Sequence, residues 1–232
     1  MGWARPPRAP DYLPANVGRG IRALFTTRAA GTQRAEVHQK RVAATMGVPV
    51  IAMKQVHGAR VAQVEPGDVA KPAPVADALI TRSSEIALSV LVADCVPVLL
   101  ADERARIVAA IHAGRRGVEA NVVGATIEEM RSIGSRTGDI RAVIGPAICG
   151  SCYEVPDEMR AEMARVIPVS ASQTRWGTPA LDLPGAVRWQ LTKQGISDID
   201  GLEVCTLENQ SLYSYRRDRE EGRFAGVIRL EK

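Results

Sequence analysis

Residues 86–102 read IALSVLVADCVPVLLAD and carry the strongest signal for how the chain folds. Its near-continuous apolar character suits either one buried helix or two buried strands. Asp94 and Pro97 interrupt the run, and its valine-rich composition favours strands over a helix. We therefore predict two buried strands with a break at ADCVP, residues 93–97.

The segments on either side of this stretch predict a mixed α/β protein. Apolar residues at 118, 122, 123, 127 and 130 share one helical face, so a helix is expected after the strand that ends at His112. Residues 155–168 and 182–195 predict two more helices. Because strands and helices do not alternate regularly, we expect a mixed sheet arrangement and not a doubly wound parallel sheet. Further strands are predicted at 22–27, 48–56, 60–65, 106–114, 140–147, 202–206 and 223–230.

Length and composition predict one domain. The chain has 232 residues, with 46% hydrophobic and 24% charged residues, which suits a globular protein with a large core. We expect residues 1–20 to be a flexible lead-in and residues 21–232 a single catalytic domain. A net charge of +4 gives no dense basic stripe, so no nucleic-acid partner is predicted. The chain shows neither a long apolar span nor a signal peptide, which predicts a cytoplasmic protein without a membrane partner.

Three residues that bind metals well occur at predicted strand ends. His57 is followed by Gly58, His112 lies two residues before Gly114, and Cys95 lies in the break between two strands. If these strands are neighbours, the three side chains converge. Two imidazoles and one thiolate suit zinc and leave a fourth position for water or substrate.

Simpler interpretations of the same residues stay open. The role of each histidine could be no more than hydrogen bonding near a strand end, and Cys95 could be a small core residue. His38, in a helical stretch, is expected at the surface. A His2Cys set also suits a blue-copper centre. A complete multicopper cluster needs more imidazoles than the three histidines of this chain, so laccase chemistry at such a cluster is excluded.

Charged residues near the predicted site suggest an anion-binding role. Arg116, in GRRG at the start of the predicted helix, and Arg28, at the end of a strand, could bind phosphate or carboxylate. Both could equally be solvated or paired with carboxylates. Asp94 is a candidate proton shuttle or partner of a histidine ligand, with the capping of a turn as the alternative.

The remaining cysteines give a weaker signal. Cys149 and Cys152 form a C-x-x-C, but the chain has no second C-x-x-C and no thioredoxin-like context, which favours a structural role. The zinc base-deaminase signature is also absent, because Gly114 stands two residues after His112 where that signature has glutamate.

Several motifs resemble those of the YfiH family in their residues, order and spacing. The resemblance covers nearly the whole chain, from about Leu24 to Leu230. Members of that family carry the labels peptidoglycan editing factor, laccase-domain polyphenol oxidase and purine nucleoside phosphorylase. The motifs are KQVHGARV, ADALITR, ADCVPVLLAD, AAIHAGRRG, GPAICGSCYEV and CTLENQSLYSYRRDREEGRFAGVIRL.

The resemblance implies an α/β sandwich of the YfiH type, with zinc bound by His57, Cys95 and His112. It also implies phosphorolysis of purine nucleosides (adenosine, inosine, guanosine and methylthioadenosine) and deamination of adenosine. Purine nucleoside and phosphate are therefore the expected partners. Peptidoglycan editing on cell-wall precursors is the alternative, and copper-dependent phenol oxidation a second one. One departure stands out: Arg115 occupies the position where the family usually has tryptophan, so the rim that faces the substrate differs.

Overall fold

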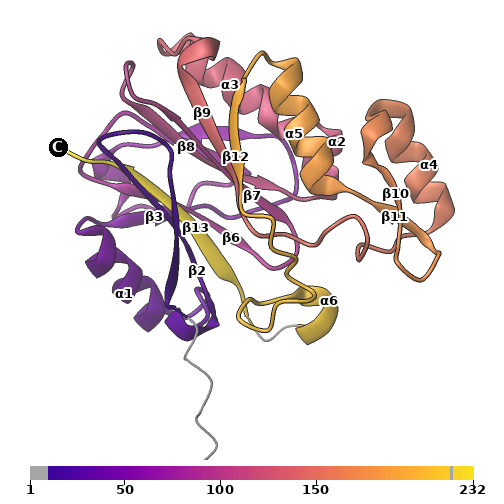
Figure 1. The fold of residues 1–232 in the computed structure, drawn as a ribbon. Coiled ribbons are helices and arrows are strands. Elements are labelled where there is room, and N and C mark those ends of the chain that lie inside the picture. The colour runs from indigo at the N-terminus through magenta and orange to yellow at the C-terminus, as the bar shows by residue number, and fades with distance from the viewer. Residues whose placement is uncertain (1–9, 220–221) are drawn as a thin grey trace, which may run out of the picture.

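Two β-sheets form the frame of the molecule (Figure 1). The computed structural model describes residues 10–219 and 222–232. One sheet has five strands in the order β1-β2-β13-β6-β3 and the other six in the order β12-β9-β7-β8-β5-β4. The five-stranded sheet comprises β1 (Tyr12–Ala15), β2 (Ile21–Thr26), β13 (Phe224–Leu230), β6 (Ala87–Val92) and β3 (Val50–Ala52). The six-stranded sheet comprises β12 (Asp198–Gly201), β9 (Ile140–Ile144), β7 (Val96–Asp102), β8 (Ile107–Ala113), β5 (Ala78–Thr81) and β4 (Val61–Gln63).

Helices cover the outer faces of both sheets (Figure 1). Helix α1 (Glu36–Met46) packs on the five-stranded sheet. The six-stranded sheet is covered by α2 (Arg115–Glu119), α3 (Val122–Ser132) and α5 (Leu183–Lys193). At one side lie α4 (Asp157–Val166) and the pair β10 (Ala171–Gln173) and β11 (Pro179–Leu181), and the short α6 (Tyr215–Asp218) precedes β13.

The alternation of side chains along the strands explains the layered core. Successive strand residues point to opposite faces of a sheet. Leu79 therefore packs in the cluster between the two sheets, with Phe25 and Leu88 of the other sheet, whereas Ile80 packs under the helices. At the centre of the six-stranded sheet, β7 and β8 are buried on both faces and are apolar almost throughout, as buried strands require. The predicted single-domain mixed α/β sandwich is confirmed.

The break predicted at ADCVP is the point where the chain crosses between the two sheets. β6 belongs to the five-stranded sheet and β7 to the six-stranded one, and residues 93–95 connect them. Asp94 has a φ of 83°, a left-handed conformation in which aspartate is one of the residues most often tolerated. The same crossing places Cys95 at one end of the sandwich.

Other expectations need correction. The lead-in predicted over residues 1–20 includes a strand, because Tyr12–Ala15 pairs with β2; residues 1–9 lie outside the described residues. The strand predicted at 202–206 lies earlier, at Asp198–Gly201, where it pairs in parallel with β9. The helix predicted after His112 begins at Arg115, and Asn121, with a φ of 58°, separates it into α2 and α3. His38 is partly buried, with Nδ1 2.9 Å from the carbonyl oxygen of Thr32.

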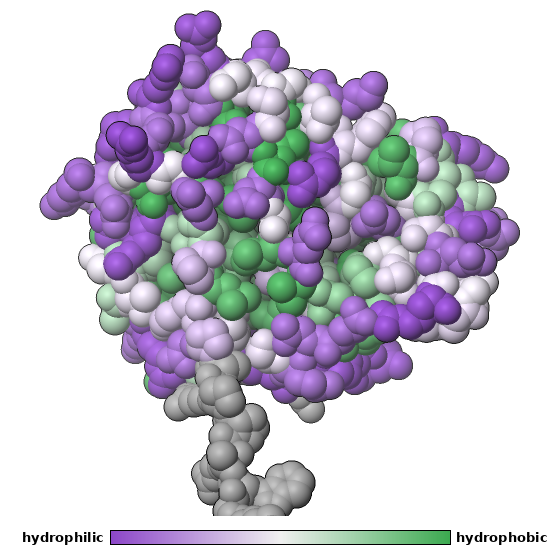
Figure 2. Space-filling model, viewed as in Figure 1, coloured by the Kyte–Doolittle hydropathy of each residue, from purple (hydrophilic) through white to green (hydrophobic). Residues whose placement is uncertain are grey.

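Polar residues cover most of the face seen in Figure 2, with apolar residues grouped near its centre. Within residues 10–219 and 222–232, no helix combines the length and apolar character that crossing a membrane requires.

Candidate metal centre and substrate pocket

The structure brings His57, Cys95 and His112 together at one end of the sandwich. His57 follows β3, Cys95 lies in the crossing between the sheets, and His112 lies in β8. One ligand atom from each residue lies within 4.8 Å of the others, and the two imidazole rings are 4.7 Å apart in an edge-to-face arrangement. The convergence expected from the sequence is therefore present.

Asp77 orients two of these three residues. Its fully buried carboxylate lies just before β5 and is 2.8 Å from Nδ1 of His112, which leaves Nε2 of that ring for a metal. The same carboxylate accepts the backbone N–H groups of His57 at 2.9 Å and Gly58 at 2.7 Å. These bonds hold the turn in which His57 adopts a φ of 60°. A carboxylate behind a histidine ligand fixes the ring and makes it a better ligand.

We expect Asp77→Asn to weaken the affinity of the His57, Cys95 and His112 group for added zinc about 10- to 100-fold, the usual cost of losing a partner of a ligand. Competition with a chelator measures this change. Asp102→Asn is the control, because Asp102 is also buried and also accepts a backbone N–H, that of Ala105. Asp102 lies at the end of β7 that is far from Cys95. Equal zinc affinity in Asp77→Asn and wild type would show that His112 does not depend on the carboxylate.

The three residues also shift one another's protonation. Burial alone would raise the pKa of the Cys95 thiol, but hydrogen bonds and positive charge from His112 and His57 lower it to about 6. Burial would lower the pKa of His112, but hydrogen bonds to Asp77 and Cys95 raise it to about 9. Cys95 is therefore a thiolate near neutral pH, the form that binds metals.

Gly114 leaves the space in which the three ligands meet. A Cβ atom on this residue would lie 2.9 Å from Cδ2 of His57 and 3.2 Å from Sγ of Cys95. Any side chain here would therefore press on the donors. The thiolate, the two imidazoles and the open space between them fit a zinc ion, since zinc takes sulfur and nitrogen ligands.

A pocket of about 410 Å³ opens over these ligands, within the usual range for small-molecule sites. Tyr153 and Tyr215 give it aromatic walls, and Arg115, Arg216 and Arg223 give it positive charge. Burial raises the pKa of Tyr153, so its phenol stays protonated and can donate a hydrogen bond. Apolar lining comes from Leu91, Val92, Ile148 and Leu183.

Asp94 lines this pocket, but its carboxylate caps a turn. One oxygen accepts the hydroxyl of Thr206 at 2.6 Å and the other accepts the backbone N–H of Arg216 at 2.7 Å. Among the described residues, the carboxylate found against a histidine ligand belongs to Asp77 and not to Asp94. Asp94 therefore places the segment that carries Tyr215 and Arg216 over the pocket, and its role as a proton shuttle stays a prediction.

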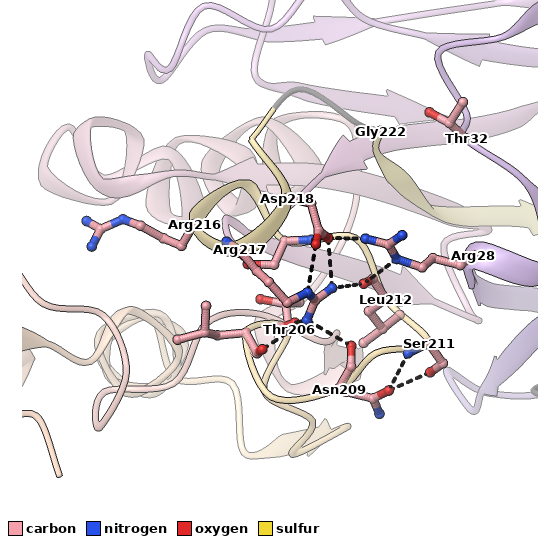
Figure 3. Close-up of polar contacts among 12 residues, drawn as sticks. Arg28, Thr32, Thr206, Asn209, Ser211, Leu212, Arg216, Arg217, Asp218 and Gly222 are labelled. Carbon is pink, nitrogen blue, oxygen red and sulfur yellow. Dashed lines mark hydrogen bonds and ion pairs between the residues drawn. The ribbon is translucent and has the colours of Figure 1, made fainter.

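Arg28 holds the C-terminal segment in place. Its guanidinium pairs with Asp218, donates to the carbonyl of Leu212 at 3.1 Å and stacks over Tyr213. Figure 3 shows Arg28 and Arg217 meeting at Asp218, while Arg216 extends away from this network. The positive charge of Arg28 is thus compensated by a carboxylate, and its predicted contact with phosphate stays a prediction.

The Asp218 network predicts a pH-dependent contribution to stability. Burial would raise the pKa of Asp218, but hydrogen bonds from Arg217, the Ser214 amide and Arg28 lower it to about 2. Ionised Asp218 therefore stabilises the fold by about 2 kcal/mol above pH 4, and this is lost as the pH falls through about 2. We expect Asp218→Asn to lower the free energy of unfolding at pH 7 by that amount and to come within about 0.5 kcal/mol of wild type at pH 2.

Denaturant unfolding across this pH range tests the prediction. The matched control is Asp198→Asn, which removes a more exposed ion pair with Arg141 and should cost less than about 1 kcal/mol. If wild type and Asp218→Asn differed in free energy of unfolding as much at pH 2 as at pH 7, the stabilisation would not come from the ionised Asp218 carboxylate.

The two arginines of GRRG differ in position. Arg115 lines the pocket and pairs with Glu119 at 2.7 Å, whereas Arg116 is exposed. The phosphate contact predicted for Arg116 stays a prediction. Arg115 is better placed for such a contact, because it lines the pocket. Sequence reasoning missed Asp77, Tyr153, Arg216 and Arg223. Of these, Asp77 had a signal, since it is the one charge in the apolar run VADALI.

Comparison with known proteins identifies the class. The family model described as multi-copper polyphenol oxidoreductase laccase matches residues 22–231. The chain belongs to this family, which is the YfiH family that its motifs resembled. The crystal structure of YfiH from Bacillus licheniformis superimposes with a TM-score of 0.86 at 27% identity, covering 96% of this chain and 97% of that one. YlmD from Geobacillus stearothermophilus gives 0.84 at 28% identity, covering 98% of each chain.

Two purine nucleoside phosphorylases are more similar to this chain in sequence than these solved structures are. The purine nucleoside phosphorylase ORF3 of Streptomyces griseus is 47% identical over 198 residues, which cover 84% of this chain and 80% of that protein. A purine nucleoside phosphorylase of Mycobacterium tuberculosis is 40% identical over 238 aligned residues, covering 93% of this chain and 94% of the relative.

Proposed function

We propose that this chain is a purine nucleoside phosphorylase with its active site in the pocket over His57, Cys95 and His112. The observation that carries the proposal is the content of that pocket: metal donors, aromatic walls and three arginines in one space of about 410 Å³. The names of the relatives at 40% and 47% identity support the same activity.

Each part of the pocket suits one part of the substrates. Tyr153 and Tyr215 offer aromatic faces and apolar surface to a purine ring. Arg115, Arg216 and Arg223 offer charge-assisted hydrogen bonds to phosphate. In the reaction a phosphate oxygen bonds to the anomeric carbon of ribose, the bond to the purine nitrogen breaks, and the purine leaves with that electron pair. The protonated phenol of Tyr153 is a hydrogen-bond donor available to the leaving purine.

The metal we propose is zinc, held by His57, Cys95 and His112. When bound, zinc would supply a Lewis acid that polarises a substrate atom. Asp77 keeps His112 oriented toward it, and Gly114 keeps the space open. The family description names copper, but the three histidines of the chain are too few for a multicopper cluster. A copper-dependent phenol oxidase would show a visible thiolate-to-copper band from Cys95.

We also propose adenosine deamination at this site, because a three-ligand set leaves a coordination position open, as catalytic zinc sites do. Chromatography of the purified zinc-loaded protein with adenosine, with and without phosphate, separates the activities. Adenine that forms only with phosphate indicates phosphorolysis, and inosine that forms without it indicates deamination. Absence of both products would show that adenosine is not its substrate, and cell-wall precursors would be tested next.

A matched pair of variants tests where phosphate binds. We expect Arg115→Ala to raise the KM for phosphate about tenfold or more, because it removes a hydrogen bond to a charged group. Arg116→Ala should leave this KM near the wild-type value, because Arg116 is exposed and lies outside the pocket lining. The reverse result would support the assignment made from the sequence and contradict the one made from the structure.

A further inference from the structure

A second group of metal-binding side chains lies outside the substrate pocket. Cys149, Cys152, Cys205 and Glu208 each place a ligand atom within 4.8 Å of the others. Cys152 is buried, Cys149 and Cys205 are partly buried, and Glu208 is exposed. No cysteine of this group takes part in the proposed phosphorolysis.

The fold supplies the partner that the C-x-x-C lacked in the sequence. Cys205 and Glu208 have the same two-residue separation as Cys149 and Cys152. A parallel bridge between Ala147 and Cys205 brings the two segments together, and the Thr206 amide donates to the carbonyl of Ala147 at 3.0 Å. The result is a C-x-x-C beside a C-x-x-E, the paired arrangement typical of structural zinc sites.

Backbone N–H groups and one arginine surround the sulfur atoms. The Cys149 amide donates to Sγ of Cys205 at 3.5 Å, and the backbone N–H groups of Ser151 and Glu208 donate to Cys149 and Cys205. Arg175 donates to Sγ of Cys152 at 2.6 Å and pairs with Glu208. The three sulfur atoms and the Glu208 carboxylate are therefore held around one space.

We propose that Cys149, Cys152, Cys205 and Glu208 bind a structural zinc ion. Tetrahedral zinc with bonds of about 2.3 Å to sulfur places its ligand atoms about 3.8 Å apart. Donors already within 4.8 Å reach this geometry by small side-chain movements. Four protein donors close the coordination shell, in contrast to the open three-ligand set at Cys95, and three thiolates favour zinc over magnesium or calcium.

This site joins two segments that line the substrate pocket. Ile148 and Tyr153 flank the C-x-x-C and line the pocket. On the other segment, Thr206 donates to Asp94, whose other oxygen holds the amide of Arg216. Zinc at the second site therefore fixes the distance between Tyr153 and Arg216, which already stack at 4.8 Å.

Metal analysis of variants of the full chain tests the proposal, which does not depend on the proposed activity. In the Cys95→Ala background, which removes the first site, we expect one equivalent of zinc per chain to remain. Cobalt bound there should give a strong near-ultraviolet thiolate-to-cobalt band. Adding Cys205→Ser should remove both the zinc and the band.

A gain-of-binding variant keeps the test informative if Cys205→Ser does not fold. Glu208→Cys completes a second C-x-x-C and should slow the loss of zinc to a chelator at least about tenfold. Glu203→Cys, which adds a thiol on the same segment but outside the donor group, should leave this rate unchanged. No zinc in Cys95→Ala, or a mass lower by two hydrogens that shows a disulfide in its place, would overturn the proposal.

Discussion

Replacement of Cys95 by alanine is expected to lower phosphorolysis of adenosine at least about 100-fold, because it removes a proposed metal ligand and not merely a partner of one. Cys95 is the thiolate of the pocket, and hydrogen bonds from His112 and His57 hold its pKa at about 6. Loss of this charge leaves two imidazoles, which bind zinc more weakly. The rate of adenine release and the zinc content, measured on the same sample, should fall together.

His38→Ala is the control for Cys95→Ala, since it changes the histidine outside the donor group. It should retain both zinc and activity. A folded Cys95→Ala protein with wild-type phosphorolysis would show that the reaction takes place elsewhere.

Gly114→Ala is expected to impair the site with a single added carbon. The new Cβ would lie 2.9 Å from the His57 ring and 3.2 Å from Sγ of Cys95, so the ligands must move apart. The φ of Gly114 is −76°, which alanine adopts without strain, so the effect should fall on the site and not on the fold. We expect zinc affinity to fall about 10- to 100-fold, as when a ligand is misplaced.

Gly138→Ala is the matched control, because a Cβ on Gly138 meets no atom within 4 Å. Chelator competition and thermal unfolding of both variants separate an effect on the site from an effect on stability. If Gly114→Ala binds zinc as tightly as Gly138→Ala does, His57, Cys95 and His112 do not lie as close to Gly114 as they do in the structure.

Periodicity and residue chemistry predicted the parts of this protein that depend on local sequence. The interruption at Asp94 and Pro97 located the crossing between the two sheets, and glycines beside His57 and His112 marked the turns at the candidate metal ligands. Short strands such as β1 were missed, because pairing with β2 and not propensity stabilises them.

Contacts between distant segments could not be predicted in the same way. The partnership of Asp77 with His112 depends on the antiparallel pairing of β5 with β8. The direction of Arg115 depends on a helix that begins three residues earlier than its apolar pattern indicated. Glu208 joins the cysteine group only through the bridge between Ala147 and Cys205.

We propose that phosphate is a substrate in the pocket over His57, Cys95 and His112. Phosphorus NMR of the zinc-loaded protein with adenosine and phosphate detects the product of this reaction, with adenine measured in parallel. We predict a ribose 1-phosphate signal equal in amount to the adenine released, and no such signal from Cys95→Ala. Adenine or inosine without a new phosphorus signal, or an equal signal from folded Cys95→Ala, would contradict the claim.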